Sequence, residues 1–534
     1  MKRRIFIILG ISCFSALPAF SQTEEWRDEY SKLSKCADFS NPAWLTEVKG
    51  AASTVRLNFD KSDGGLIDIG ESSDSWQGGL DARSFLRISN RLQAYGRMEY
   101  GYFRGSKMGG PILLDPYYNP VNFLESTDTT TGTKILEKYS LEGSLAYSLN
   151  DRLKLAGRFL YESGNYAKRK DPRPNNQWMD MEIGVGIKYS FRQGGPAAGF
   201  GLTYAKTLET IDVDIFGTLD RNYFYLVDYG GIFGKVEQIE GDYGYLSTSV
   251  ERPMFNQFLG GNVQACLPFS ESLTLRADAS LAYREGYFGN KASGSVRFCD
   301  FTGWKYFAHA WLDYKADKLS HRLEGSLNVM TTENEENSWQ ITTNPGENSK
   351  VEYFGKNKAG DKTVGKVNVT YSLSRNSRKG ILPSWGAGIS YSGFLVDQKG
   401  ILYPFYRKQK LNQNLIKAFG LKNIYLKHGL MSISGEIRYA FHGDDLKNED
   451  GSYASASGSP RSIDAYLNNT FEYYSSSRLG AGLGVRYSLA KEIRGHEYNF
   501  FAEISDSCDN LTGKAEYLTG NNRNKLLLTI GCDF

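Results

Sequence analysis

The ten residues from Lys525 to Phe534, KLLLTIGCDF, determine how the rest of the chain is interpreted. In an extended strand, alternate side chains point to opposite faces, so this stretch divides into an apolar and a more polar face. The apolar face consists of Leu526, Leu528, Ile530, Cys532 and Phe534. A membrane barrel strand must present such a face to lipid, whereas the last strand of a soluble domain has no such need. The stretch therefore predicts a lipid-facing strand, with an edge strand of a soluble sandwich as the alternative.

The closing aromatic residue resembles the C-terminal signal of Gram-negative outer-membrane proteins, a final strand of alternating apolar residues that ends in Phe. The resemblance implies that the barrel-assembly machinery recognises this end, and that the protein lies in the cell outer membrane in contact with the lipid bilayer. The residues of the assembly signal are Leu528, Ile530, Cys532 and Phe534. In a closed barrel, we expect this strand to pair with the first strand, near Thr54 to Asp60.

The composition suits a membrane barrel. Of 534 residues, 14% are aromatic, 35 are Tyr and 57 are Gly, and the mean hydropathy is -0.44. This polar average excludes a bundle of membrane-spanning helices, but it fits a barrel whose alternate residues face lipid while the lumen is wet. The formal net charge of +3 argues against nucleic acid as a partner, because phosphate binding needs a concentrated basic surface.

The amino end indicates export. Lys2, Arg3 and Arg4 precede an apolar run from Ile5 to Phe20, and Ala19-Phe20-Ser21 forms a cleavage site. This order of charged, apolar and small residues is that of a secretory signal peptide. The expected domains are a signal peptide at residues 1–21, an amino-terminal segment at 22–52 and a barrel at 53–534.

From Gly79 onward, the chain repeats one unit: an alternating strand, a short turn, a second strand and a longer polar loop. For example, Tyr139 to Leu149 and Leu153 to Tyr161 alternate on the two sides of a turn at Asn150-Asp151. Strands of about ten residues are long enough to cross a bilayer. Short turns alternating with long loops are typical of outer-membrane barrels.

The predicted fold is all-β, a transmembrane antiparallel up-and-down β-barrel of about 20 strands, within a range of roughly 16 to 22. The number should be even, because both chain ends are expected on the periplasmic side. Ser293 to Lys315 is predicted as one long strand, and Arg221 to Ser249 leaves open whether strands extend above the membrane. The short amino-terminal segment is expected in the periplasm or in the lumen.

Asn41-Pro42-Ala43 lies shortly before the first strand. Pro fixes φ and Asn bonds its own backbone, so the tripeptide forms a rigid turn. The tripeptide resembles the NPA element of the fatty-acid-transporter-like outer-membrane barrels. The resemblance implies that residues 22–52 fold into the lumen as a hatch, with Asn41, Pro42 and Ala43 as the candidate hatch residues. The alternative is a loop turn without that role.

The positions opposite the apolar faces carry charges of both signs. Because a charge facing lipid costs about 2–4 kcal/mol near the midplane, these residues are predicted to line the lumen. A pore selective for one sign of ion would carry a ring of one sign, which is absent from this sequence pattern. Solvated or mutually paired interior charges and a specific substrate path both stay open. The candidate lumen-lining residues are Arg97, Glu99, Arg158, Glu182, Arg276, Asp278, Arg322, Glu324, Glu436, Arg438 and Arg486.

We predict no enzyme, no cofactor and no metal site. The run His442-Gly443-Asp444-Asp445 falls where the outer rim of a barrel protease would carry catalytic Asp and His, but Asp and Gly are also ordinary loop residues. Two carboxylates and one His without metal-ligand spacing make a weak metal site.

Two functions fit the sequence. The first is a passive channel or transporter for small solutes, with the amino-terminal segment as its hatch. The alternative is an interaction scaffold whose long outer loops dock a surface lipoprotein or a neighbouring transporter, because exposed aromatic patches mark contact surfaces. Gly110 to Phe123 (GPILLDPYYNPVNF) and Gly400 to Tyr406 (GILYPFY) are the aromatic loops that motivate it. The same loops are equally compatible with folding inward to constrict a pore.

Overall fold

The structure is a computed structural model. It describes residues 40–47, 51–125, 130–217, 222–229, 232–239, 243–290, 295–343, 346, 349–375, 382–403, 406–443, 446–450 and 464–534. The expected signal peptide, 1–21, lies outside the described residues, as do residues 22–39 of the amino-terminal segment.

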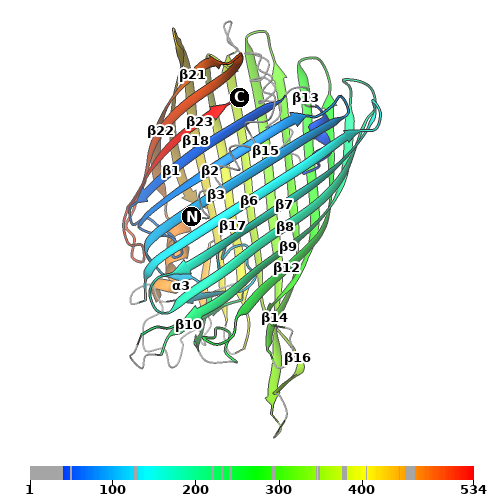
Figure 1. Cartoon of the computed structure of the whole chain (residues 1–534). Helices are drawn as coiled ribbons and strands as arrows, with labels where there is room; N and C mark the ends of the chain where they lie inside the picture. Colours follow the sequence, from blue (N-terminus) through cyan, green and yellow to red (C-terminus); the bar gives the residue numbers. More distant parts are fainter. Residues whose placement is uncertain are drawn as a thin grey trace.

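Within this described part of the chain, 18 antiparallel strands form a closed barrel (Figure 1). Each strand pairs with the next barrel strand in the sequence, and the last pairs with the first. The predicted fold class and the even strand number are confirmed, and the count lies within the predicted range. The strands are β1 (Ala52–Asp63), β2 (Asp74–Arg87), β3 (Leu92–Met108), β6 (Gly132–Ser148), β7 (Leu153–Lys168), β8 (Arg173–Ser190), β9 (Ala197–Asp214), β12 (Arg252–Pro268), β13 (Leu273–Gly289), β14 (Arg297–Lys315), β15 (Leu319–Thr342), β16 (Lys350–Arg375), β17 (Trp385–Gly400), β18 (Arg407–Leu426), β19 (Gly429–His442), β21 (Arg478–Ile493), β22 (His496–Leu511) and β23 (Asn522–Asp533).

The barrel closes between β1 and β23, as the sequence predicts. Thr54 lies opposite Asp533 and Asp60 opposite Leu527 in an uninterrupted antiparallel register. Just beyond the end of β23, the carbonyl of Phe534 accepts the backbone N–H of Ser53 in β1 at 2.7 Å, and the N–H of Phe534 donates to the carbonyl of Ser53 at 2.9 Å. The last residue therefore contributes two hydrogen bonds to the seam.

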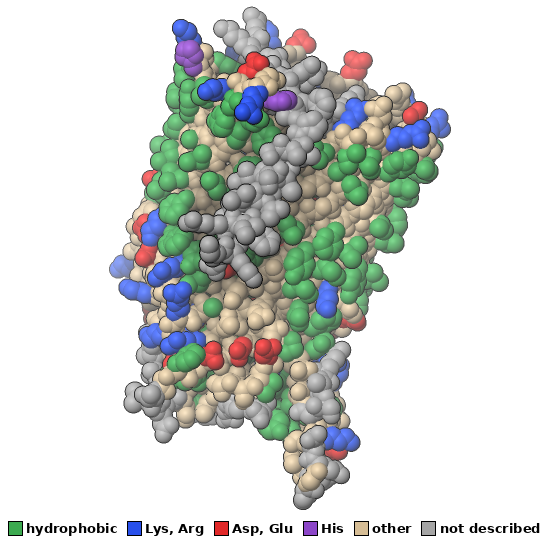
Figure 2. Space-filling model, in the orientation of Figure 1, with side chains coloured by type: hydrophobic (Ala, Val, Ile, Leu, Met, Phe, Trp, Pro, Cys, Tyr) green, Lys and Arg blue, Asp and Glu red, His purple; other side chains and the backbone are tan. Residues whose placement is uncertain are grey.

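The outer surface is apolar. Figure 2 shows hydrophobic side chains over the barrel wall, with most charged side chains near its two ends. On β22, for example, Ile504 is 49% exposed, whereas its neighbours Glu503 and Ser505 have the opposite orientation and are half-buried. This alternation around a closed barrel places the protein in the outer membrane, with the apolar face against lipid. Among the described residues, no helix is long and apolar enough to span a membrane.

The connections differ in length at the two ends. Turns such as Asn150-Asp151 and Arg494-Gly495 are short and lie at the end that carries Ala52 and Phe534. At the opposite end, the connections are longer and the β15–β16 hairpin projects beyond the wall (Figure 1). One connection contains β20 (Lys447–Asp450) and the helix α3 (Asp464–Ser475). By the topology of outer-membrane barrels, the short turns face the periplasm.

Two of the long connections fold into the barrel instead of extending it. They contribute β4 (Gly110–Pro111), β5 (Asn122–Glu125), β10 (Phe224–Asp228) and β11 (Ile232–Gln238), which form a separate sheet in the order β11-β10-β5-β4. Here we call it the inner sheet. Its buried core includes Phe123 and Val227 and packs on luminal side chains of the wall, among them Met254, Phe288 and Phe301. Arg221 to Ser249 thus does not lengthen the barrel strands, whereas Ser293 to Lys315 contains the predicted long strand, β14.

The orientation of β22 generates a stability prediction. Ile504→Lys should lower the free energy of unfolding by about 2–4 kcal/mol, because it places a charge on the lipid face near the middle of the strand. Ser505→Lys, on the luminal face next to it, should cost much less. Denaturant unfolding in lipid vesicles, followed by Trp fluorescence, measures both. Equal losses for the two variants would contradict the assigned lipid face.

The seam generates an assembly prediction. Deleting Phe534 removes both hydrogen bonds to Ser53 and the end of the assembly signal, so we expect a large loss of barrel from outer-membrane fractions. Heat modifiability on gels measures the yield of folded barrel. Phe534→Tyr keeps the ring and the backbone and serves as the control with near-normal yield. A deletion variant with unchanged yield would show that the last residue is dispensable for assembly.

Candidate functional site

Residues 40–47 of the amino-terminal segment lie inside the lumen. Their short 3-10 helix η1 (Pro42–Glu47) contacts β3, β6, β7 and β8, and Trp44 packs with Ala197, Cys266 and Trp311 of β9, β12 and β14. Asn41, Ala43 and Trp44 are completely buried. So short a segment can reach strands over so much of the circumference only from within the barrel. Here we call residues 40–47 the hatch segment, after the role that the sequence predicts for them.

Asn41 joins the hatch segment to the wall. Its Nδ2 donates to the carbonyls of Ile187 at 2.9 Å and Phe200 at 3.2 Å and to Oε1 of Gln264 at 3.0 Å, while its Oδ1 accepts the N–H of Ala43 at 2.9 Å. These contacts lie in a notch of the barrel wall, where two glycines leave room for the Asn41 side chain. A Cβ on Gly186 would lie 2.0 Å from Asn41 Oδ1, and one on Gly199 would lie 3.0 Å from Asn41 Nδ2.

Charged groups flank this contact. Ser40 donates from its N–H and from its hydroxyl to the carboxylate of Asp278, both at 2.8 Å. At the other end of the segment, Glu47 pairs with Lys188 at 2.6 Å and with Arg276 at 3.4 Å. The Lys188 ammonium also lies 4.3 Å from the ring centroid of Trp44. Arg276 and Asp278, both predicted to line the lumen, therefore hold the hatch segment.

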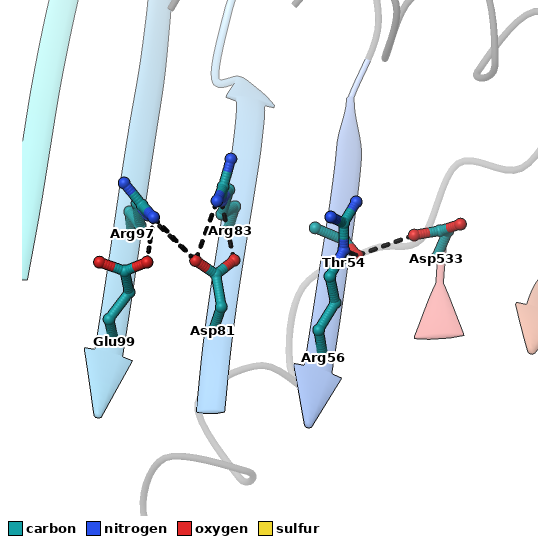
Figure 3. Close-up of polar contacts among 7 residues, drawn as sticks. All are labelled: Thr54, Arg56, Asp81, Arg83, Arg97, Glu99 and Asp533. Atoms are coloured by element: carbon teal, nitrogen blue, oxygen red, sulfur yellow. Dashed lines mark hydrogen bonds and ion pairs between the residues drawn. The ribbon is translucent and has the colours of Figure 1, made fainter. Parts of the chain in front are cut away.

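The remaining predicted lumen residues form ion pairs, some within one strand and some between strands. In Figure 3, Asp81 of β2 lies between Arg83 and Arg97, at 2.8 and 3.0 Å, and Arg97 also pairs with Glu99. On the neighbouring strand, Thr54 donates to Asp533 across the seam at 2.7 Å. The other pairs are Arg158 with Glu142 and Glu182, Arg322 with Asp313 and Glu324, Glu324 with His309, Arg438 with Glu436 and Asp509, and Arg486 with Glu503 and Asp533. Mutual pairing is therefore the arrangement of these charges.

A buried charge cluster ties the inner sheet to the wall. Glu125 of β5 pairs with Lys134 of β6 at 3.1 Å and with Lys168 of β7, and all three side chains are at most 1% exposed. Lys134 donates further to the carbonyl of Pro111 at 2.8 Å. Breaking one member of such a cluster leaves an uncompensated buried charge, which is strongly destabilising. Sequence reasoning missed this cluster, because Glu125 and Lys134 belong to one apparent polar loop and Lys168 to another.

The aromatic stretch Gly110 to Phe123 folds inward. Ile112, Val121 and Phe123 are almost fully buried. The hydroxyl of Tyr117 donates to Asp68 at 2.7 Å, and Asp68 also accepts from Thr470 of α3 at 2.6 Å. Burial raises the pKa of Tyr117 well above its ordinary value, with the Asp68 charge adding to the shift, so this hydroxyl keeps its proton at neutral pH. Three outer connections are thereby held together over the lumen.

The second aromatic stretch, Gly400 to Tyr406, is partly buried and partly exposed. Leu402 is buried with the core of the inner sheet, whereas Tyr403 is 86% exposed. Pro404 and Phe405 lie outside the described residues.

Described residues line a cavity in the periplasmic half of the lumen, away from the hatch segment. Its volume is about 500 Å³, within the range of roughly 300–1,000 Å³ common for small-molecule sites. Strands β18, β19, β21, β22, β23 and β1 line it, with Arg56, Arg486, Glu503 and Asp533 among its polar groups. Arg486 is the predicted lumen residue that this cavity includes.

The candidate rim and metal residues form no site within the part of the chain that is described. His442 is exposed at the end of β19, and Asp444 and Asp445 lie outside the described residues. No group of three or more His, Cys, Asp or Glu side chains among the described residues is placed to hold a metal ion.

Comparisons with known proteins add distant structural similarities. The chain is similar to the ferric preacinetobactin receptor BauA from Acinetobacter baumannii, with 10% identity and a TM-score of 0.42, over 91% of this chain and 81% of that one. It is also similar to the ferric yersiniabactin uptake receptor FyuA from Yersinia pestis, with 7% identity and a TM-score of 0.43, over 91% and 80%. Both scores are low, so we draw no functional conclusion from them.

No curated protein matches the sequence. A family profile, however, matches residues 42–534, which include nearly the whole hatch segment and every strand of the barrel. Because this match covers most of the sequence, the assignment is plain: the chain belongs to the family of unknown function DUF6850.

Proposed function

We propose that this protein is an outer-membrane transporter that passes small solutes passively and is closed at rest by its own hatch segment. The observation that carries the proposal is the docking of Asn41 in the notch at Gly186 and Gly199. At Gly186 the Asn41 amide fills the space that a side chain would need, and at Gly199 it shares that space with Gln264, which fits a segment with a defined seat in the lumen.

The electrostatics of the seat support a reversible closure. Asp278 accepts from Ser40, and Lys188 and Arg276 share Glu47, so both ends of the hatch segment are held by charge-assisted contacts. Such contacts are made with water when the segment leaves, which limits the cost of undocking. The resemblance of Asn41-Pro42-Ala43 to the NPA element of fatty-acid-transporter-like barrels adds to this proposal.

The inner sheet supplies the second closure, on the outer side. Its buried contacts to β6, β7, β12, β13 and β14 make it a fixed constriction rather than a lid. The solute route that we propose passes through the space that the hatch segment fills, beside the cavity of about 500 Å³ at the opposite wall. Loosening the hatch segment is then the step that opens the periplasmic side.

The alternative function, an interaction scaffold that docks a surface lipoprotein, has less support from the aromatic loops than the sequence suggested. It needed aromatic loops on the surface, and Gly110 to Phe123 is instead part of the buried core. Tyr403 and Phe354, which are 86% and 66% exposed, still support it. The barrel-assembly machinery and a lipoprotein both stay proposed partners.

Removing the hatch segment tests the main proposal. A barrel that keeps its signal peptide but lacks residues 22–47 should show a larger single-channel conductance in planar bilayers than the full protein. The physical reason is the removal of a buried block that contacts four neighbouring strands. Heat modifiability of the shortened barrel verifies that it is folded. An unchanged conductance in a folded, shortened barrel would refute the hatch.

Adding one methyl group at Gly186 gives a more specific test of the seat of Asn41. Gly186→Ala places a Cβ where Asn41 Oδ1 now lies, which should expel the amide, break its hydrogen bonds and raise the open probability. Each buried group left unsatisfied costs about 1–3 kcal/mol, which corresponds to roughly a 5- to 150-fold shift toward the undocked state.

Gly184→Ala is the matched control. Gly184 precedes Gly186 on the same face of β8, but the nearest heavy atom to an added Cβ is 3.5 Å away, an ordinary contact. Its bilayer conductance should therefore equal that of the unmodified protein. Equal open probabilities for both alanine variants would contradict the proposed seat of Asn41.

A further inference from the structure

Strand β14 contacts both closures of the lumen and leaves a stretch between them open to solvent. Its Phe301 belongs to the core of the inner sheet, and its Trp311 packs on the hatch segment. Lys305 lies between these two contacts and is exposed. Its neighbours Trp304 and Tyr306 are 41% and 42% exposed on the lipid face, so the side chain of Lys305 points into the lumen. Solvent therefore reaches the lumen between the inner sheet and the hatch segment.

Two strands further round the wall, Lys366 of β16 is a second exposed lysine. It lies opposite Asn328 of β15 in the sheet register, and Asn328 is exposed as well. The Lys366 ammonium lies 5.6 Å from the ring centroid of Phe394, which itself packs on Tyr117 at 5.4 Å between ring centroids. Lys366 is therefore luminal and adjoins the outer closure, as Lys305 does. Here we call Lys305, Asn328 and Lys366 the lysine surface.

The two lysines of this surface differ from other luminal lysines in their pairing. Among the described residues, no carboxylate forms an ion pair with Lys305 or Lys366. Asp180 of β8 interacts electrostatically with Lys305, but without an ion pair. Elsewhere in the lumen, for comparison, lysines have carboxylate partners: Lys138 pairs with Glu162 at 2.9 Å and Lys417 with Glu436 at 3.6 Å. In the described structure, two unpaired ammonium groups thus stand against one carboxylate.

Such an excess of positive charge attracts anions. The lipid around the barrel has a low dielectric constant, so the wall focuses the field of the two ammonium groups into the wet lumen. Each ammonium group carries three N–H donors, and the Asn328 amide adds two more without charge. Carboxylate and phosphate oxygens accept charge-assisted hydrogen bonds from ammonium groups. The lysine surface therefore offers both the charge and the donors that an oxyanion needs.

We infer that the lysine surface binds small oxyanions, the carboxylate or phosphate groups of a solute on its way through the lumen. Lys305 and Lys366 contact the anionic oxygens, and Asn328 donates from its amide. The inference rests on the proposed function, because it names the charge class of the solute that this transporter passes.

Anion binding to the purified, full-length barrel in a non-ionic detergent tests this assignment. The probes are inorganic phosphate and succinate, each titrated by calorimetry. Binding of at least one of them is expected, and the better ligand identifies which oxyanion the surface prefers. Binding should weaken as the KCl concentration rises, because salt screens exposed charges.

Three variants of the charges have expected effects of different sign. Lys305→Gln and Lys366→Gln should each weaken anion binding roughly threefold, the effect of one exposed charge. Asp180→Asn should strengthen binding by about twofold, because it removes a charge that repels the anion. A general loss of structure does not produce both signs.

Lys206→Gln is the matched control. Lys206 lies on the same outer face of β9 as the exposed Tyr204, so this variant removes the same charge from the lipid side of the wall. Its anion binding should equal that of the unmodified protein. Heat modifiability of every variant verifies that the barrel is folded.

Three results would overturn the assignment: no binding of phosphate or succinate in the millimolar range, an equal loss in Lys206→Gln, or weaker binding in Asp180→Asn. Absent anion binding, with a barrel that Gly186→Ala still opens, would leave the transporter and reject the lysine surface. Conversely, anion binding without any conductance change in the hatch variants would retain the surface and reject the transporter.

Discussion

Every backbone N–H and C=O in the bilayer core must be paired within the protein, because lipid offers no hydrogen-bond partner and each unpaired group costs several kcal/mol. A sheet meets this demand only when its two edges meet. Here they meet between β1 and β23, in a register that runs from Thr54 opposite Asp533 toward the outer rim. Asp533 fixes that register with its side chain as well, through Thr54 of β1 and Asn499 of β22.

An 18-strand barrel encloses more space than the side chains of its wall fill. Two other segments of the same chain occupy part of this space. The inner sheet occupies the outer half, held by a fully buried set of Glu125, Lys134 and Lys168. The hatch segment occupies one side of the periplasmic half. The inner sheet and the hatch segment are held differently. The inner sheet has a large apolar core, whereas the hatch segment combines the packing of Trp44 with polar contacts at Ser40, Asn41 and Glu47.

The sequence predicts the barrel because lipid imposes a simple rule on every strand. Alternation in Lys525 to Phe534 recurs along the chain, and it identifies which face of each strand meets lipid. The alternation does not predict where Asn41 binds, because Gly186 and Gly199 become neighbours only through the register of β8 and β9. The burial of Gly110 to Phe123 could not be predicted for another reason: an apolar loop has the same sequence whether it lies on a surface or in a core. Which luminal charges pair with one another also depends on the register of the strands. The sequence therefore predicts the face on which these charges lie but not their partners.

The inner sheet also has a consequence for the order of assembly. Its strands β5 and β10 are separated by four barrel strands in the sequence, yet Phe123 lies opposite Val227 in one antiparallel pair. Both lie in the first half of the chain, whereas the seam that encloses them needs the final residues of the second half. The inner sheet is therefore synthesised well before the strand that closes the barrel around it.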